Sequence, residues 1–165
     1  MRVLGIDPGT LNLGYGVVDE EGGTMTMVAC GVLSQPSKVP VERRLSSLYK
    51  ELVEIVARYK PDEVAIEEPF VAGNARSALA IGRAQAIAIL AAANENLPIF
   101  RYLPTQVKQQ VTNYGGSDKE QVQEMVRLQL GLAQPPQPSD ASDALAVAIC
   151  HLHQRHIERL LAGSK

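Results

Sequence analysis

Acidic side chains follow several stretches that the sequence predicts to be buried strands. Asp7 comes directly after the apolar residues 3–6, and Pro8 and Gly9 then end the strand, because proline lacks a donor N–H and glycine tolerates a positive φ. A buried carboxylate is costly to desolvate unless a cation meets it. The position therefore favours a metal ligand or a contact with a basic partner, and the alternative is an aspartate that only caps the turn.

Two further acidic groups stand at the ends of other predicted elements. Glu67 and Glu68 end the short, mostly apolar stretch 63–68, and residue parity does not tell which of them points inward, because a strand covered on both faces has no readable alternation. Asp140 and Asp143 stand three residues apart in the first turn of a predicted helix, so both side chains share one face. Taken alone, this pair can simply complement the helix dipole.

Carboxylates from three such elements repel one another unless hard cations hold them together. Ligation by oxygen alone suits Mg²⁺ or Mn²⁺. Two such ions about 4 Å apart would hold a phosphodiester, with one ion activating water and the other stabilising the leaving oxygen. The chemistry that these residues suggest is metal-assisted hydrolysis of a phosphodiester.

The rest of the chain predicts an α/β domain that brings these acids together. The first three strands are expected to form an antiparallel meander, with Val28, Cys30 and Val32 on one buried face, and the later strands join through helical crossovers. The result is a five-stranded mixed sheet flanked by helices, with Thr105 and Ser139 as helix N-caps. Strands are expected at 2–7, 13–19, 24–34, 63–68 and 98–103. Helices are expected at 41–59, 74–96 and 119–130, as a short helix that contains Lys108 and is capped by Thr105, and after Ser139.

The composition suits a single domain that spans the whole chain of 165 residues, 45% of them hydrophobic. The net charge of −2 argues weakly against nucleic-acid binding, but without four acidic residues in one metal site the remainder carries +2, which leaves room for a basic rim. The sequence shows no signal-peptide core and no apolar run that approaches the ~20 residues of a membrane span. We therefore expect a cytoplasmic protein without a membrane segment.

Other potential ligand residues do not suggest a second metal site. Cys30 and Cys150 have no CxxC spacing and indicate neither a disulfide nor a zinc framework. His151 and His153 point to different sides of one predicted helix, and together with His156 they are not expected to hold a metal. The helix at 74–96 is rich in alanine, so it can pack very closely against a sheet or a second subunit.

Four separated motifs in order resemble the RuvC-type Holliday junction resolvases. They are the IDPG and GYG opening at residues 6–16, AIEEPF at 65–70, QVKQ at 106–109 and DASDALA at 140–146, and the resemblance covers nearly the whole chain. It implies a ribonuclease H-like fold and a homodimer that nicks two opposed strands of a four-way DNA junction symmetrically with Mg²⁺, in recombination and repair. It also suggests a RuvAB-type branch-migration helicase as a partner.

The resemblance also implies roles for individual residues. The metal-binding and catalytic residues would be four acids, with the first acid of the 67–68 pair as the ligand: Asp7, Glu67, Asp140 and Asp143. Lys108 and Lys119 match basic positions near the scissile phosphate, where a cation offsets developing charge. Phe70 would stack on an unpaired base at the junction centre, and Arg76 and Arg83 are candidate phosphate contacts.

Three other functions remain open at the level of sequence. Residues 7–10 also resemble the first phosphate loop of the actin-like sugar and acetate kinases, but that activity needs a second similar lobe, for which this chain has no room. A ribonuclease H-like nuclease that acts on RNA would use the same acids. A junction-binding protein without catalysis would tolerate their loss, so their full retention argues against it.

Overall fold

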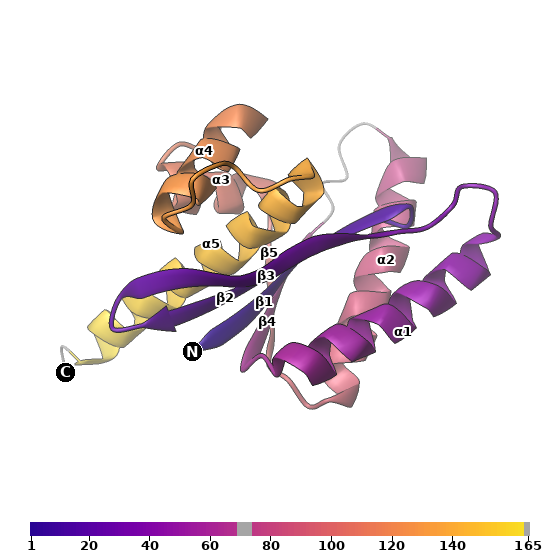
Figure 1. The fold of residues 1–165 in the computed structure, drawn as a ribbon, viewed down its shortest axis with the longest axis horizontal. Coiled ribbons are helices and arrows are strands. Elements are labelled where there is room, and N and C mark those ends of the chain that lie inside the picture. The colour runs from indigo at the N-terminus through magenta and orange to yellow at the C-terminus, as the bar shows by residue number, and fades with distance from the viewer. Residues whose placement is uncertain (69–73, 164–165) are drawn as a thin grey trace.

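A five-stranded sheet in the order β3-β2-β1-β4-β5 forms the centre of the fold. In the computed structural model, which describes residues 1–68 and 74–163, the strands are β1 (Arg2–Asp7), β2 (Asn12–Glu21), β3 (Thr24–Ser34), β4 (Glu63–Glu67) and β5 (Ile99–Tyr102). The first three strands are antiparallel neighbours, and β4 and β5 continue the sheet parallel to β1. The predicted mixed α/β sheet is therefore confirmed (Figure 1).

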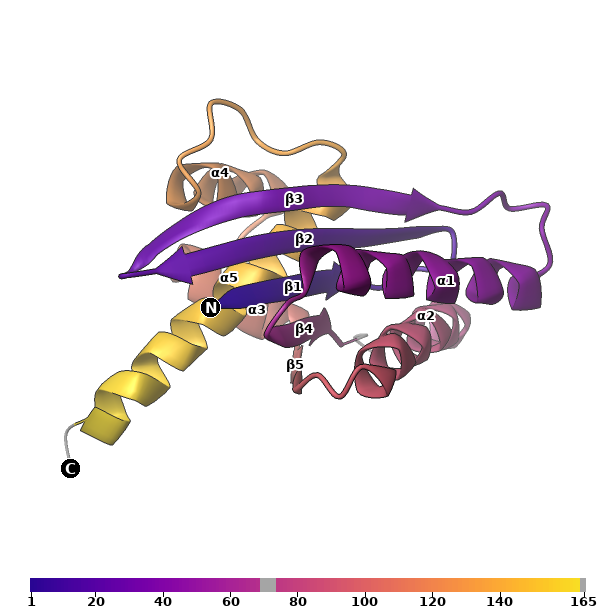
Figure 2. The same ribbon diagram turned by 60° about the horizontal axis from the view of Figure 1, so that its bottom comes forward.

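Helices cover both faces of this sheet (Figures 1 and 2). They are α1 (Val41–Tyr59), α2 (Ala75–Asn94), α3 (Pro104–Thr112), α4 (Lys119–Gln129) and α5 (Ser139–Gly163). The amphipathic α1 and the alanine-rich α2 share one apolar core with β1 and β2, whereas α5 builds a second core with α3 and α4. Side chains of β1 alternate between these cores, since Val3 joins the α5 side and Leu4 the α1 side.

Helix α5 lies directly on the backbone of β1 and β2. A Cβ atom placed on Gly5 would lie 2.1 Å from the carbonyl oxygen of Ala144, and one on Gly14 would lie 2.1 Å from the carbonyl oxygen of Asp140. Both positions therefore need glycine for a close approach of the helix to the sheet. This approach brings the first turn of α5 to the end of β1, where Asp7 stands.

The predicted buried face of β3 is wrong at Val28, which is 39% exposed. A β-bulge causes the difference, because the register between β2 and β3 shifts between Val17 and Val18. An extra residue in one strand reverses the side-chain alternation beyond it. Val28 lies at this register shift, so it does not share one buried face with Cys30 and Val32 as simple alternation predicts.

Two residues that the sequence predicts as N-caps lie inside their helices instead. Helix α3 begins at Pro104, so Thr105 is its second residue, and the side chain of Gln106 accepts from the Leu103 N–H at 2.8 Å. Proline suits the first helical position because its missing N–H would be unpaired there in any case. Helix α5 likewise begins at Ser139 itself.

Helix α2 departs from the expectation that no apolar run is long enough for a membrane. Within residues 1–68 and 74–163, it is the one helix whose length and composition would suffice to cross a bilayer. A core helix of a soluble protein that is mostly buried passes the same test, whereas 22% of this α2 window is buried. The buried residues of α2 are Ala84, Ala88, Ala91 and Ala92. Its exposed apolar residues include Leu79 and Leu90.

Candidate metal centre

Three aspartates from two elements converge at one end of the sheet. Asp7 is the last residue of β1, and Asp140 and Asp143 lie in the first turns of α5. One carboxylate oxygen from each of the three lies within 4.8 Å of the others. The first turn of α5 reaches Asp7 because Gly14 offers no side chain below Asp140.

Glu67 ends β4, the parallel neighbour of β1, so it stands beside Asp7 at the same edge of the sheet. It lines a pocket of about 180 Å³ together with Asp143. Glu68 is used differently, because its Oε1 lies 3.7 Å from the Nε of Arg101 in an ion pair. The geometry thus distinguishes the two glutamates, which residue parity could not, and favours Glu67 as the acid that faces the aspartates.

Burial and mutual repulsion keep these carboxyl groups from ionising easily. Burial is the main cause that raises the pKa of Asp7 to about 8, and the nearby charges of Glu67, Asp143 and Asp140 add to it. Burial, with a contribution from Asp143, raises the pKa of Glu67 to about 7. Added positive charge at this site would therefore be stabilising near neutral pH.

Two lysines face the acids from the helices above them. Lys108 of α3 and Lys119 of α4 line the same pocket as Glu67 and Asp143. The Nζ of Lys119 lies 2.8 Å from Oδ2 of Asp143. Burial nevertheless remains the larger influence on Asp143, whose pKa is raised although the Lys119 ammonium lowers it.

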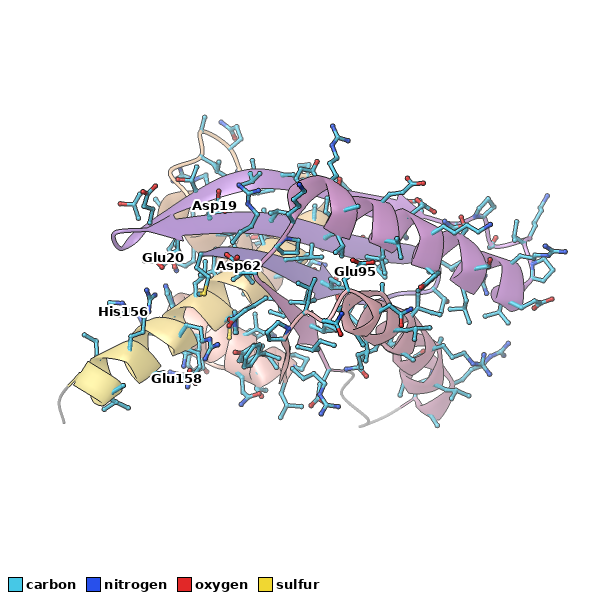
Figure 3. All side chains as sticks on the ribbon, turned by 90° about the horizontal axis from the view of Figure 1, so that it is seen from below. Asp19, Glu20, Asp62, Glu95, His156 and Glu158 are labelled. Carbon is cyan, nitrogen blue, oxygen red and sulfur yellow. The ribbon has the colours of Figure 1, made fainter. Side chains whose placement is uncertain are left out.

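A second acidic group at the opposite end of the sheet provides a contrast (Figure 3). There Asp19 forms an ion pair with Arg2 at 2.8 Å, and Glu20 pairs with Arg159 at 3.0 Å. Each of these acids is matched by its own arginine, and the pKa of each is lowered, mainly by its hydrogen bonds. The acids around Asp7 show the opposite behaviour, which is typical of a site built to receive a cation.

The donor set fits a hard divalent cation. All candidate ligand atoms are carboxylate oxygens, and nitrogen or sulfur ligands that would select zinc are not part of the cluster in the described residues. Carboxylates from elements with buried backbones are held in place before any ion arrives. Asp7, Asp140 and Asp143 could hold one ion together, and Glu67 stands where it could share a second with Asp143.

Comparison with known proteins assigns the chain to a family. The family model described as "Crossover junction endodeoxyribonuclease RuvC" matches residues 3–151. The chain belongs to this RuvC family. A RuvC of Dehalococcoides mccartyi (strain BAV1) is 52% identical over 98% of this chain and 97% of its own length, and one of Chloroflexus aggregans is 51% identical over 93% of each. These matches confirm the resemblance drawn from the four motifs and identify an endodeoxyribonuclease, a hydrolase.

Solved structures agree with this RuvC assignment. The structure of Thermus thermophilus RuvC superposes with a TM-score of 0.89 at 35% identity, covering 96% of this chain and 97% of that one. The complex of the same protein with a Holliday junction substrate gives 0.90 at 34% identity, covering 96% of each chain. The ribonuclease H-like fold is therefore confirmed, and the RNA nuclease and the non-catalytic protein are not favoured.

The remaining DNA-binding predictions for this RuvC chain fall partly outside the cluster. Arg76 and Arg83 are exposed on α2, which packs against the face of the sheet opposite α5. Arg76 lies in the first turn of α2, eight residues after Glu68, whereas Arg83 is two turns farther along the helix. Phe70 lies outside the residues that the structure describes. Contacts of these three residues with DNA remain predictions.

A buried polar network at the start of β4 was missed by the sequence analysis. The Oη of Tyr102 lies 2.7 Å from Nδ1 of His151, and Nε2 of that ring lies 2.6 Å from Oε2 of Glu63. Arg155 donates to the same carboxylate, with its Nε 2.9 Å from Oε2, and covers the ring of Phe100. Burial lowers the pKa of His151, so the neutral ring can accept at Nδ1 and donate from Nε2. The available signal was a charged residue, Glu63, at the start of a buried apolar strand.

Proposed function

We propose that this RuvC-family chain resolves four-way DNA junctions by metal-dependent hydrolysis, with Asp7, Glu67, Asp140 and Asp143 as the metal-binding, catalytic residues. The observation that carries the proposal is the convergence of three aspartate oxygens within 4.8 Å, with Glu67 beside them. Two Mg²⁺ ions, for which Mn²⁺ could substitute, would supply an activated water and neutralise the leaving oxygen. The single nuclease domain of 165 residues would supply all four ligands.

The chain's own residues would do the positioning. Asp7 and Glu67 stand on adjacent strands of the sheet, and Asp143 is tied to the packed helix α5, so the ligands are fixed before substrate binds. Lys108 and Lys119 face the same pocket and would offset charge on the scissile phosphate. Phe70 would stack on an unpaired base, an interaction worth ~1–3 kcal/mol, and Arg76 and Arg83 would contact phosphates.

Junction DNA as substrate is supported by the Thermus thermophilus complex described above. Two opposed strands require two active sites, which a two-fold symmetric homodimer provides. Helix α2 is the proposed interface, because its exposed side carries small and apolar residues such as Ala86, Ala93, Leu79 and Leu90. A RuvAB-type branch-migration helicase as partner, and a location in the cytoplasm, are proposed from the resemblance alone.

The decisive experiment is cleavage of a synthetic four-way junction with mobile arms, beside linear duplex and RNA–DNA hybrid. With Mg²⁺ we expect paired symmetric nicks on the junction and none when the metal is chelated. Activity on the hybrid without junction cleavage would keep the metal centre and overturn the substrate. If none of the substrates is cleaved while the protein still binds the junction, the result would support a binding protein instead.

Adjacent glutamates offer a matched test of the ligand set. Glu67→Gln should abolish cleavage while leaving junction binding intact, whereas Glu68→Gln, which removes the same charge one residue away, should keep most of the activity because Glu68 pairs with Arg101. Asp7→Asn should behave like Glu67→Gln. Unchanged cleavage by Asp7→Asn would contradict the metal mechanism.

A further inference from the structure

The ion pair between Lys119 and Asp143 places an ammonium group on one of the proposed metal ligands. Its Nζ lies 2.8 Å from Oδ2 of Asp143, a charge-assisted hydrogen bond. We propose that the Lys119 ammonium competes with a divalent cation for Asp143, so that a second metal ion binds tightly only when a substrate phosphate draws Lys119 away. This inference rests on the proposed function, since it concerns the occupancy of the same centre.

The competition follows from the position of Asp143 between two groups of ligands. One of its oxygens belongs to the cluster with Asp7 and Asp140, and its side chain also lines the pocket with Glu67. An ion shared between Glu67 and Asp143 would need an oxygen of Asp143 on the pocket side. Among residues 1–68 and 74–163, Lys119 is the one basic residue that forms an ion pair with a member of this group of four acids, and its partner is Asp143.

Lys119 can leave this contact without disturbing the fold. Its side chain is 54% exposed, whereas that of Asp143 is 21% exposed and belongs to a helix packed on the sheet. The backbone of Lys119 is fixed independently, because Asp118 accepts from the Gln121 N–H at 2.8 Å and caps α4. A lysine carries its charge on a flexible four-carbon stem, so the ammonium is the partner that moves.

A phosphate in the pocket would supply the second partner that Lys119 needs. The ammonium would exchange one carboxylate oxygen for a phosphate oxygen, and the freed oxygen of Asp143 would then be available to a cation. Metal binding and substrate binding would consequently strengthen each other, and the coupling must be equal in both directions. Until DNA binds, the Lys119 ammonium would neutralise part of the negative charge of the acidic cluster.

The test is a Mn²⁺ titration of the DNA-free protein, with free Mn²⁺ followed by electron paramagnetic resonance. Lys119→Met should tighten the weaker of two Mn²⁺ sites by about tenfold, since one charge-assisted contact no longer has to be broken. Lys108→Met is the matched control, because it removes the same charge from the same pocket, and it should tighten binding by no more than about threefold. Circular dichroism would verify that both variants fold.

A second titration includes a four-way junction with cleavage-resistant linkages, corrected for Mn²⁺ bound by DNA alone. The junction should tighten the weaker site in the wild-type protein and tighten it less in Lys119→Met. Equal Mn²⁺ affinity and stoichiometry in wild type, Lys119→Met and Lys108→Met would overturn the competition while leaving the metal centre intact. Absence of Mn²⁺ binding in all three proteins would instead overturn the proposed function, and the competition with it.

Discussion

Replacing Gly14 with alanine should open the metal centre from a position that is not itself a ligand. The added Cβ would lie 2.1 Å from the carbonyl oxygen and 2.7 Å from the carbonyl carbon of Asp140. Both are backbone atoms, so no side-chain rotation relieves the overlap. Separation to 3.0 Å, a distance below which Cβ contacts are essentially never found, requires α5 and β2 to move apart by about 0.9 Å.

This movement has two measurable consequences. Overpacking of this size costs typically ~1–3 kcal/mol of folding free energy, which a denaturant titration of the metal-free protein would detect. The shift also carries Asp140 away from Asp7, and a misplacement of about 1 Å can reduce activity by ~10²-fold. Mn²⁺ affinity should fall together with junction cleavage, because the same displacement affects both.

Gly82→Ala is the matched control for this prediction. A Cβ on Gly82 meets no atom within 4 Å, and the residue lies inside α2, where alanine is the better helix former by roughly 0.5–1 kcal/mol. Its Mn²⁺ affinity should equal that of the wild type, with equal or greater stability. Wild-type metal affinity and cleavage in Gly14→Ala would refute the reasoning that the close approach of α5 sets the geometry of the centre.

Three further predictions concern other parts of the chain. The metal-free protein should lose stability as the pH rises from about 4 to about 8, because native Asp7 still binds a proton that the unfolded chain has released; thermal unfolding in chelator should show this slope, reduced in Asp7→Asn. Ala86→Glu should shift the protein towards monomer in sedimentation, and an unchanged dimer would contradict the α2 interface. Glu63→Ala should lower the unfolding free energy by ~2–3 kcal/mol in urea, since His151 and Arg155 lose their shared acceptor.

The sequence was informative where the signal is local. Apolar runs that end in acids located Asp7 and the pair Glu67 and Glu68 at strand ends. The three-residue spacing placed Asp140 and Asp143 on one helix face. The β-bulge opposite Val17 and Val18 was not predictable from alternation, because it is a property of the pairing between strands.

Local sequence signals do not predict contacts between segments that are far apart in the chain. The fit of Gly14 against Asp140 joins residues far apart in the chain, and nothing in the local sequence of either predicts the other. The ion pair of Lys119 with Asp143 likewise depends on how α4 packs over α5. Residue parity left Glu67 and Glu68 open and the family resemblance favoured Glu67, a prediction that the ion pair of Glu68 with Arg101 supports.

The hydrogen bond between Glu63 and His151 disfavours structures in which helix α5 is out of register with strand β4. From Glu63 to Glu67 the strand β4 rises by about 13 Å, and from His151 back to Asp143 the helix α5 rises by about 12 Å. A slip of α5 by one residue would rotate His151 away from the carboxylate of Glu63 and displace Arg155, its other partner on α5. A buried carboxylate that loses such contacts is strongly unfavourable. The alignment that satisfies this remote pair also brings Asp143 level with Glu67. A misalignment at the acidic end of β4 and α5 is therefore unfavourable at their other end as well.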